Sequence, residues 1–174
     1  ASDGYRRVTS RRWCVFRMPF FNRLFRPACA VCSLAPGPIC VDCEADFFPA
    51  GRRRCAVCAI RLHGGGLVCG RCLASPPSFH RATALADYAP PVDAMVMALK
   101  FRARLELASV FGGLLAQRVA VVGDALVIPV PLAFERLSER GFNQSLQIAR
   151  AFCRASGARL GADVVRRIRH APPQ

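Results

Sequence analysis

Eight of the ten cysteines stand in four Cys-x-x-Cys pairs, and this spacing is the clearest chemical signal in the sequence. The pairs are Cys29/Cys32, Cys40/Cys43, Cys55/Cys58 and Cys69/Cys72. Two cysteines separated by two residues can wrap a tight turn so that both thiolates face one ion, and two such turns complete a tetrahedral zinc site. One pair alone would be weak evidence, because redox motifs share it. Four pairs in so short a stretch predict two zinc ions.

Two arrangements of the four pairs are compatible with this spacing. Sequential pairing places Cys29, Cys32, Cys40 and Cys43 on one ion, and Cys55, Cys58, Cys69 and Cys72 on the other. Cross-brace pairing would instead combine the first pair with the third. We favour sequential pairing, because its loops of seven and ten residues are short and close at small entropic cost.

The other candidate ligands fall outside this pattern. We expect His63 to be a surface residue, and Cys14 and Cys153 to be ordinary thiols. A closed site with four thiolates has no open coordination position, so we assign no catalytic residue. Ten cysteines without a recognisable export signal favour metal ligation in a reducing compartment, and we expect a cytoplasmic protein with no inserted membrane segment.

The net charge of +14 is carried almost entirely by arginine, since Lys100 is the only lysine. The basic residues are concentrated at the two ends of the chain, while the middle is close to balanced. This distribution suits polyanion partners such as phosphates or nucleic acid. A merely solubilising surface explains the charge equally well.

We expect three segments along the chain. Residues 1–26 form a basic N-terminal segment that we expect to be poorly ordered, and residues 27–75 form a double zinc ribbon with no sustained periodicity, so that metal largely replaces a core. The stretch 75–78 (Ser-Pro-Pro-Ser) reads as a stiff linker. Residues 79–174 then form the N-terminal part of an α/β domain.

The pattern of this second domain alternates between helix and strand. A weakly alternating stretch at 82–88 suggests a short strand, and apolar residues at helical spacing predict helices over 92–99 and about 105–119. A continuous apolar run at 126–130 predicts a buried parallel strand, followed by a loop at 132–142 and a helix over 143–155. A further strand at 162–168 would complete a βαβ unit, and hence an α/β fold.

The loop after the 126–130 strand lies where such sheets bind ligands. It offers Arg136, Arg140 and the flexible Gly141, together with the backbone amides of Asn143 and Gln144. Guanidinium groups and free N–H groups at a helix N-terminus suit a pyrophosphate. The alternative is that the arginines are simply solvated beside acidic neighbours.

Several of these motifs together resemble the ComF family, bacterial phosphoribosyltransferase-like proteins associated with competence and DNA uptake. The matching strings are Val127-Ile128-Pro129-Val130-Pro131, Arg136-Leu137, Arg140-Gly141-Phe142-Asn143-Gln144, Tyr88-Ala89-Pro90-Pro91-Val92 and Leu99-Lys100-Phe101, preceded by the cysteine pairs. The resemblance implies a type I phosphoribosyltransferase fold that binds phosphoribosyl pyrophosphate, with magnesium if the intact enzyme is active. It also implies that the turn carrying Arg140 holds the pyrophosphate.

The sequence departs from that family at one point. The family's ribose-phosphate loop, an acidic pair followed by a Thr-Thr-Gly type turn, has no counterpart here, because no two acidic residues are adjacent. We therefore expect an incomplete domain, truncated before that loop, which binds a pyrophosphate ligand without transferring the phosphoribosyl group. The alternative function is a zinc-ribbon module that binds single-stranded DNA or RNA, and the competence machinery is a further candidate partner.

Overall fold

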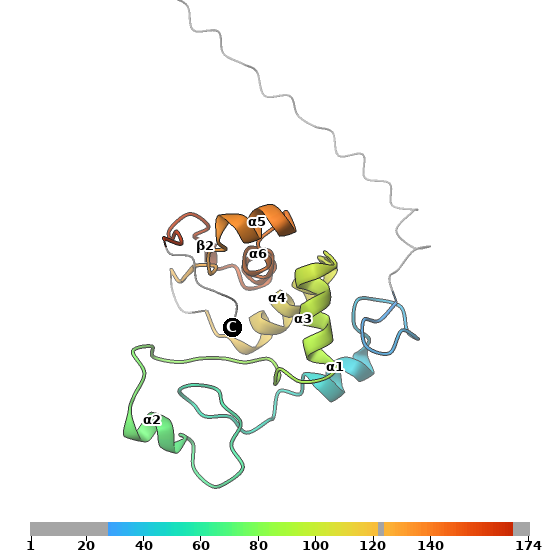
Figure 1. Cartoon of the computed structure of the whole chain (residues 1–174). Coiled ribbons are helices and arrows are strands. Elements are labelled where there is room, and N and C mark those ends of the chain that lie inside the picture. Colours follow the sequence, from blue (N-terminus) through green and yellow to red (C-terminus); the bar gives the residue numbers. More distant parts are fainter. Residues whose placement is uncertain (1–27, 122–123, 169–174) are drawn as a thin grey trace, which may run out of the picture.

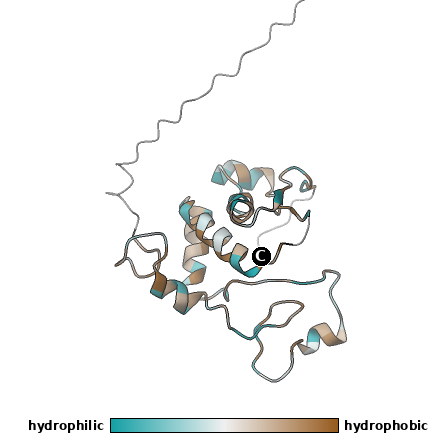
Figure 2. Ribbon diagram, turned by 180° about the vertical axis from the view of Figure 1, so that it is seen from behind, coloured by the Kyte–Doolittle hydropathy of each residue, from teal (hydrophilic) through white to brown (hydrophobic). Residues whose placement is uncertain are grey.

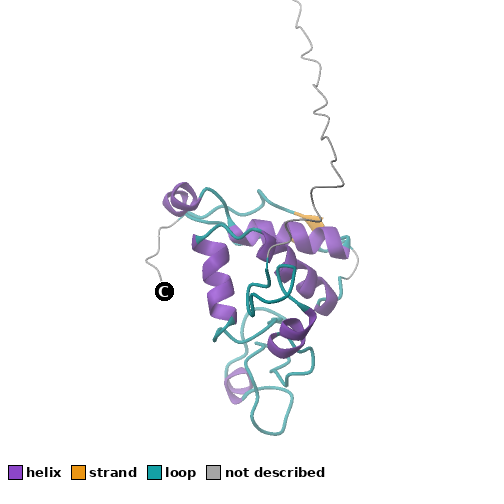
Figure 3. Cartoon of the chain, turned by 90° about the vertical axis from the view of Figure 1, so that its right-hand side faces the viewer, coloured by secondary structure: helices purple, strands orange, loops and turns teal. Residues whose placement is uncertain are grey.

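The computed structural model describes residues 28–121 and 124–168, mainly as short helices joined by loops (Figure 3). In chain order the elements are α1 (Val41–Phe47), α2 (Gly70–Ala74), α3 (Val92–Phe101), α4 (Glu106–Arg118), β1 (Leu126–Val127), α5 (Phe134–Arg140), α6 (Gln144–Ser156) and β2 (Arg159–Leu160). Figure 1 shows α3, α4 and α6 close together, whereas α2 lies apart from them. The basic segment 1–26 and Cys14 lie outside the described residues.

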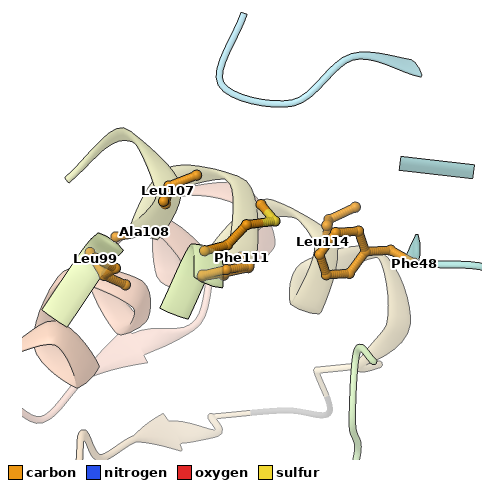
Figure 4. Close-up of a cluster of buried hydrophobic side chains, with 7 residues drawn as sticks. Phe48, Leu99, Leu107, Ala108, Phe111 and Leu114 are labelled. Carbon is orange, nitrogen blue, oxygen red and sulfur yellow. The ribbon is translucent and has the colours of Figure 1, made fainter. Parts of the chain in front are cut away.

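A hydrophobic core joins α3 and α4 and extends to the residue that follows α1. Its buried members are Phe48, Met95, Leu99, Leu107, Ala108, Phe111 and Leu114. Figure 4 shows Phe48 beside Leu114 at one end of this cluster. The rings of Phe48 and Phe111 lie with their centroids 6.2 Å apart and tilted by 55°, a favourable aromatic arrangement. Each such side chain contributes roughly 1.5–3 kcal/mol when it is fully removed from water.

Helices α4 and α6 form the most extensive contact between elements, and they meet at Gly112. A Cβ placed on Gly112 would lie 2.5 Å from the Cβ of Ala151 and 2.7 Å from the backbone of α6. Only a residue without a side chain fits there, so the sequence of α4 sets how closely the two helices approach.

The ends of α6 follow from local chemistry. The side chain of Asn143 caps the helix by accepting hydrogen bonds from the N–H groups of Ser145 and Leu146. Gly157 ends it in the left-handed conformation, with φ of 76°. Helices α3, α4 and α6 thus confirm the predicted helices over 92–99, 105–119 and 143–155 within a few residues.

The predicted strands are only partly confirmed. Strand β1 pairs with β2 in parallel, as expected, but each has only two residues, and Leu126 is 45% exposed rather than buried. Strand β1 cannot continue as a regular ladder because Pro129 and Pro131 have no N–H to donate.

Three local predictions are wrong. Residues 162–168 are irregular because pairing with β1 takes place earlier, at β2, directly after the turn at Gly157. Residues 82–88 are also irregular. The predicted loop at 132–142 contains helix α5, whose residues Phe134–Arg140 include good helix formers and which ends at Gly141 with φ of 73°. This mixed helical arrangement with a small parallel sheet is compatible with the expected α/β class.

Hydrophobic residues are not confined to the core, and brown stretches also follow the loops (Figure 2). Among the large ones, Leu34 is 91% exposed and Val130 69% exposed. None of the helices in the described part of the chain is both long and apolar enough to cross a membrane.

Candidate metal centres and arginine turn

The first four cysteines form one compact cluster, which we call the first cysteine unit (residues 28–48). The sulfur atoms of Cys29, Cys32, Cys40 and Cys43 lie within 4.8 Å of one another. The chain turns tightly around the first pair, where the N–H of Cys29 donates to the carbonyl of Ala35 at 2.8 Å. The N–H of Cys40 points at the sulfur of Cys29, 3.4 Å away. The two pairs therefore face each other across a single small space.

The second cysteine unit (residues 54–74) repeats this construction. The sulfur atoms of Cys55, Cys58, Cys69 and Cys72 also lie within 4.8 Å of one another. The N–H of Cys69 points at the sulfur of Cys55 at 3.3 Å, and the N–H of Cys55 donates to Ile60 at 2.8 Å. Even the left-handed residue after the first pair recurs, at Ser33 with φ of 58° and Ala59 with φ of 61°.

A short helix completes each unit. Cys40 and Cys69 directly precede α1 and α2, and Cys43 and Cys72 lie buried in the first turns of these helices. Neither helix is predictable from the sequence, because a helix of seven or five residues gives too short a pattern for periodicity to detect.

The cysteines within each cluster differ in their thiol pKa, so some of them ionise more easily than others. Burial raises the pKa of Cys29, but the backbone N–H groups of Cys32, Val31 and Cys40 outweigh it and lower the pKa to about 6. The backbone N–H groups of Cys58 and Cys69 likewise lower the pKa of Cys55 to about 6.

The last cysteine of each unit shows the opposite shift. Burial, together with the neighbouring thiols, raises the pKa of Cys43 and that of Cys72 to about 12. Four thiolates so close together repel one another, and a bound dication would remove that penalty.

These two clusters fit zinc. Four thiolates in a tetrahedral cluster are a common ligand set of structural zinc, so each group could hold one ion. The grouping is the sequential one and not the cross-brace. The described cysteines form no disulfide, and His63 is exposed and belongs to neither group. Cys153 also lies outside both clusters, and burial raises its pKa.

The turn between α5 and α6, residues 140–144, is the second candidate site. The guanidinium carbon of Arg140 lies 4.8 Å from the ring centroid of Phe101, and Nη1 donates to Oε1 of Gln144 at 3.3 Å. The Nε of Arg140 is buried and has no hydrogen-bond partner among the described residues. A hollow of about 160 Å³ beside it is lined by Lys100, Phe101 and Glu139. Arg140 and Gln144, two of the five residues proposed from sequence for this site, therefore lie in contact.

Other predicted members of this site are placed differently. Arg136 forms an ion pair with Glu139 at 3.7 Å, within α5. Asn143 uses its side-chain oxygen to cap α6 and its nitrogen to donate to the carbonyl of Val130 at 3.1 Å. Lys100 lies in the last turn of α3, where a positive charge is favourable against the helix dipole, so its presence in the sequence does not by itself mark a site.

A group of three arginines around Asp87 was not predicted from the sequence. Arg54 lies 2.8 Å from Asp87, and Arg52 and Arg61 lie 3.5 and 3.6 Å from it. The hydrogen bond from Arg54, together with the charges of these arginines, lowers the pKa of the Asp87 carboxyl. Sequence spacing cannot indicate this contact, since Asp87 is distant in the chain from all three.

Arg118, at the end of α4, connects three parts of the chain. Its Nη1 donates to the carbonyl of Leu85 at 2.6 Å, and its Nη2 donates to the carbonyl of Phe48. The guanidinium therefore joins α4 to the end of the first cysteine unit and to the segment that leads into α3.

Comparison with known proteins finds relatives named DNA utilization protein YhgH and Competence protein F. The chain is 33% identical over 122 residues to DNA utilization protein YhgH of Salmonella typhi, a match that covers 66% of this chain and 54% of the relative. It is 40% identical over 98 residues to the protein of that name in Escherichia coli K12, covering 52% of this chain and 43% of the relative. Competence protein F of Haemophilus influenzae is 28% identical over 166 residues, covering 88% of this chain and 69% of that protein.

These matches confirm the resemblance to the ComF family that the motifs indicated. The chain spans about half the length of the YhgH relatives that it matches. No family model and no solved structure matches the chain.

Proposed function

Because the chain is a homologue of Competence protein F and of DNA utilization protein YhgH, we propose that it serves in DNA utilization as a zinc protein that binds a pyrophosphate-containing ligand. The ligand would bind at the turn between α5 and α6. The observation that carries this proposal is the buried Nε of Arg140, which has no acceptor among the described residues.

The surroundings of Arg140 support an anionic ligand. A buried guanidinium N–H without an acceptor costs free energy, and a phosphate oxygen would supply the missing acceptor. Lys100 lines the same hollow and adds a second positive charge, while Phe101 holds the guanidinium from one face. Glu139 is the acidic residue of this lining and is already paired with Arg136.

The identity of the ligand rests on the family resemblance. We propose phosphoribosyl pyrophosphate, with Arg136, Arg140, Gly141, Asn143 and Gln144 as the residues around the pyrophosphate, and magnesium as its companion in an active protein. Arg136 would have to exchange its contact with Glu139 for the ligand. Residues 1–174 contain no adjacent acidic pair to hold the ribose hydroxyls, so we expect these residues on their own to bind the ligand without phosphoribosyl transfer.

The two zinc ions have a structural role in this proposal. We assign Cys29, Cys32, Cys40 and Cys43 to one ion, and Cys55, Cys58, Cys69 and Cys72 to the other. All four positions around each ion are filled by sulfur, which leaves no place for a substrate or a reactive water. Reduced thiolates also favour the cytoplasm as the location.

Affinity for pyrophosphate tests the site. Arg140→Ala should weaken binding by roughly tenfold or more, because it removes a charge-assisted contact. Arg150→Ala removes an equal charge from an exposed position on α6 and should change the affinity little. Equal affinities of the two variants would contradict the proposal. Turnover of phosphoribosyl pyrophosphate by residues 1–174 would show that the expected inactivity is wrong.

A further inference from the structure

A second basic hollow lies where the second cysteine unit meets the end of α4, and it shares no lining residue with the hollow at Arg140. This cleft has a volume of about 410 Å³, which is large enough for a small ligand. Three segments line it: 49–59, 81–84 and the last residues of α4. The pyrophosphate proposal does not use any of them.

The charge of the cleft is strongly one-sided. Arg52, Arg54, Arg81 and Arg118 all line it, and no acidic residue does. Asp87, just outside the lining, pairs with two of these four arginines, Arg52 and Arg54. Four arginines around one small space outnumber the neighbouring carboxylates of Asp87 and Glu44, which leaves a net positive potential there.

The arginines differ in how they are held. Arg118 is fixed by the carbonyls of Leu85 and Phe48, and Arg54 by the carbonyl of Ala59 at 3.0 Å. The guanidinium of Arg81 is exposed and has no hydrogen-bond or ion-pair partner in residues 28–121 and 124–168. The cleft thus combines fixed positive groups with one free arginine at its rim.

The pKa of Arg118 reflects both its burial and the charges near it. Burial lowers the pKa of its guanidinium, and the positive charge of Arg54 lowers it further, against a smaller opposing effect of Glu44. A bound anion would relieve this repulsion. The hydroxyl of Thr83 and the amide of Gln117 also line the cleft and offer neutral donors.

We propose that this cleft binds a phosphate-bearing anion, with Arg54 and Arg118 as its fixed floor and Arg81 as the arm that closes on the ligand. The phosphate can belong to a free anion or to the backbone of a single strand, because a guanidinium recognises both in the same way. A ligand held there would also join the second cysteine unit to α4.

Arg81 allows a clean test, because its side chain supports no described contact. Arg81→Gln and Arg53→Gln remove the same charge from nearby exposed positions, but only Arg81 lines the cleft. Both changes are made in the zinc-loaded chain that already carries Arg140→Ala, so that the turn between α5 and α6 does not contribute. The probes are inorganic pyrophosphate and a labelled oligothymidylate.

We expect Arg81→Gln to weaken at least one probe about tenfold, and Arg53→Gln to change either probe less than about twofold. A loss with pyrophosphate identifies a free phosphate group as a sufficient ligand. A loss confined to the oligothymidylate identifies the nucleic-acid backbone as the source. If Arg81→Gln and Arg53→Gln have equal effects on both probes, the cleft proposal is overturned. Failure of the Arg140 proposal is distinct, since it is read from Arg140→Ala alone in the otherwise unchanged chain.

Discussion

The two cysteine units have the same local construction but different relations to the rest of the molecule. Each places its sulfur atoms within 4.8 Å, directs the N–H of its third cysteine at the sulfur of the first, and begins a short helix there. The first unit packs into the hydrophobic core through Phe48, with Ala30, Val31 and Ile39 against it. The core cluster includes no residue of the second unit.

The second unit is held mainly by polar contacts. Arg54 and Arg61 pair with Asp87, and the N–H of Ala82 donates to the carbonyl of Val57 at 2.7 Å. The same metal chemistry therefore has different energetic consequences. In the first unit a metal would fix a part of the core, whereas in the second it would fix a module that carries one wall of the basic cleft.

Removing a metal ligand from each unit should give the largest difference. Cys29→Ser and Cys55→Ser are matched, since each removes the first cysteine of its unit. Each variant lacks one of the four thiolate ligands of its unit and should therefore lose one zinc ion. The effect should be large, because structural zinc contributes roughly 10–16 kcal/mol in small domains. Only Cys29→Ser should also abolish cooperative melting of the helices, followed by circular dichroism. Identical melting of the two variants would remove the distinction between the units.

Replacing the hydrophobic anchor of the first unit should have the next largest effect. Phe48→Ala removes an aromatic ring that is 4% exposed, and we expect the free energy of unfolding to fall by about 3–5 kcal/mol. Leu73→Ala, on α2 of the second unit, alters a side chain that is 70% exposed, and we expect a change within about 0.5 kcal/mol. Urea denaturation measures both. A cost at Leu73 similar to that at Phe48 would mean that both units are packed into the fold.

The contact between α4 and α6 involves no residue of the second unit, so changes there test the helical core alone. Gly112→Ala would place a methyl group against α6, and we expect a loss of about 1–3 kcal/mol. Gly113→Ala meets nothing within 4 Å and should be neutral or stabilise the helix by up to about 1 kcal/mol. Zinc binding by the second unit should be unchanged in both variants. Equal stability of the two would contradict the close approach of the helices.

The ion pairs at Asp87 should give the smallest effect. Asp87→Asn leaves three arginines without their carboxylate, and we expect a loss of a few tenths to about 1 kcal/mol at low salt, which shrinks as salt is added. Hydrogen exchange of amides in residues 54–62 measures it locally. Faster exchange confined to the first unit would show that Asp87 does not hold the second.

The sequence predicted those parts of the molecule that depend on local spacing. The cysteine pairs indicated both clusters, and the apolar residues at helical spacing indicated helices α3 and α4. These features are determined by residues a few positions apart, which is the range over which side-chain patterns are informative.

The parts that were missed depend on long-range contacts or on weak local patterns. The prolines after β1 shorten a run that reads as a strand by composition alone, and α5 lacks a buried face to reveal it. The contacts of Arg118 with Phe48 and Leu85, and that of Arg54 with Asp87, join residues that are distant in the chain, so sequence spacing could not predict them. Spacing also could not show that Arg136 pairs with Glu139 while Arg140 lies over Phe101.

X-ray absorption of the protein prepared with zinc, combined with metal analysis, tests the central claim most directly. Two sequential clusters of four thiolates predict two zinc ions per chain, each with four sulfur ligands at about 2.3 Å. Each ion should be lost separately, one in Cys29→Ser and the other in Cys55→Ser. A single ion per chain, nitrogen ligands in the first shell, or loss of both ions from either variant would contradict it.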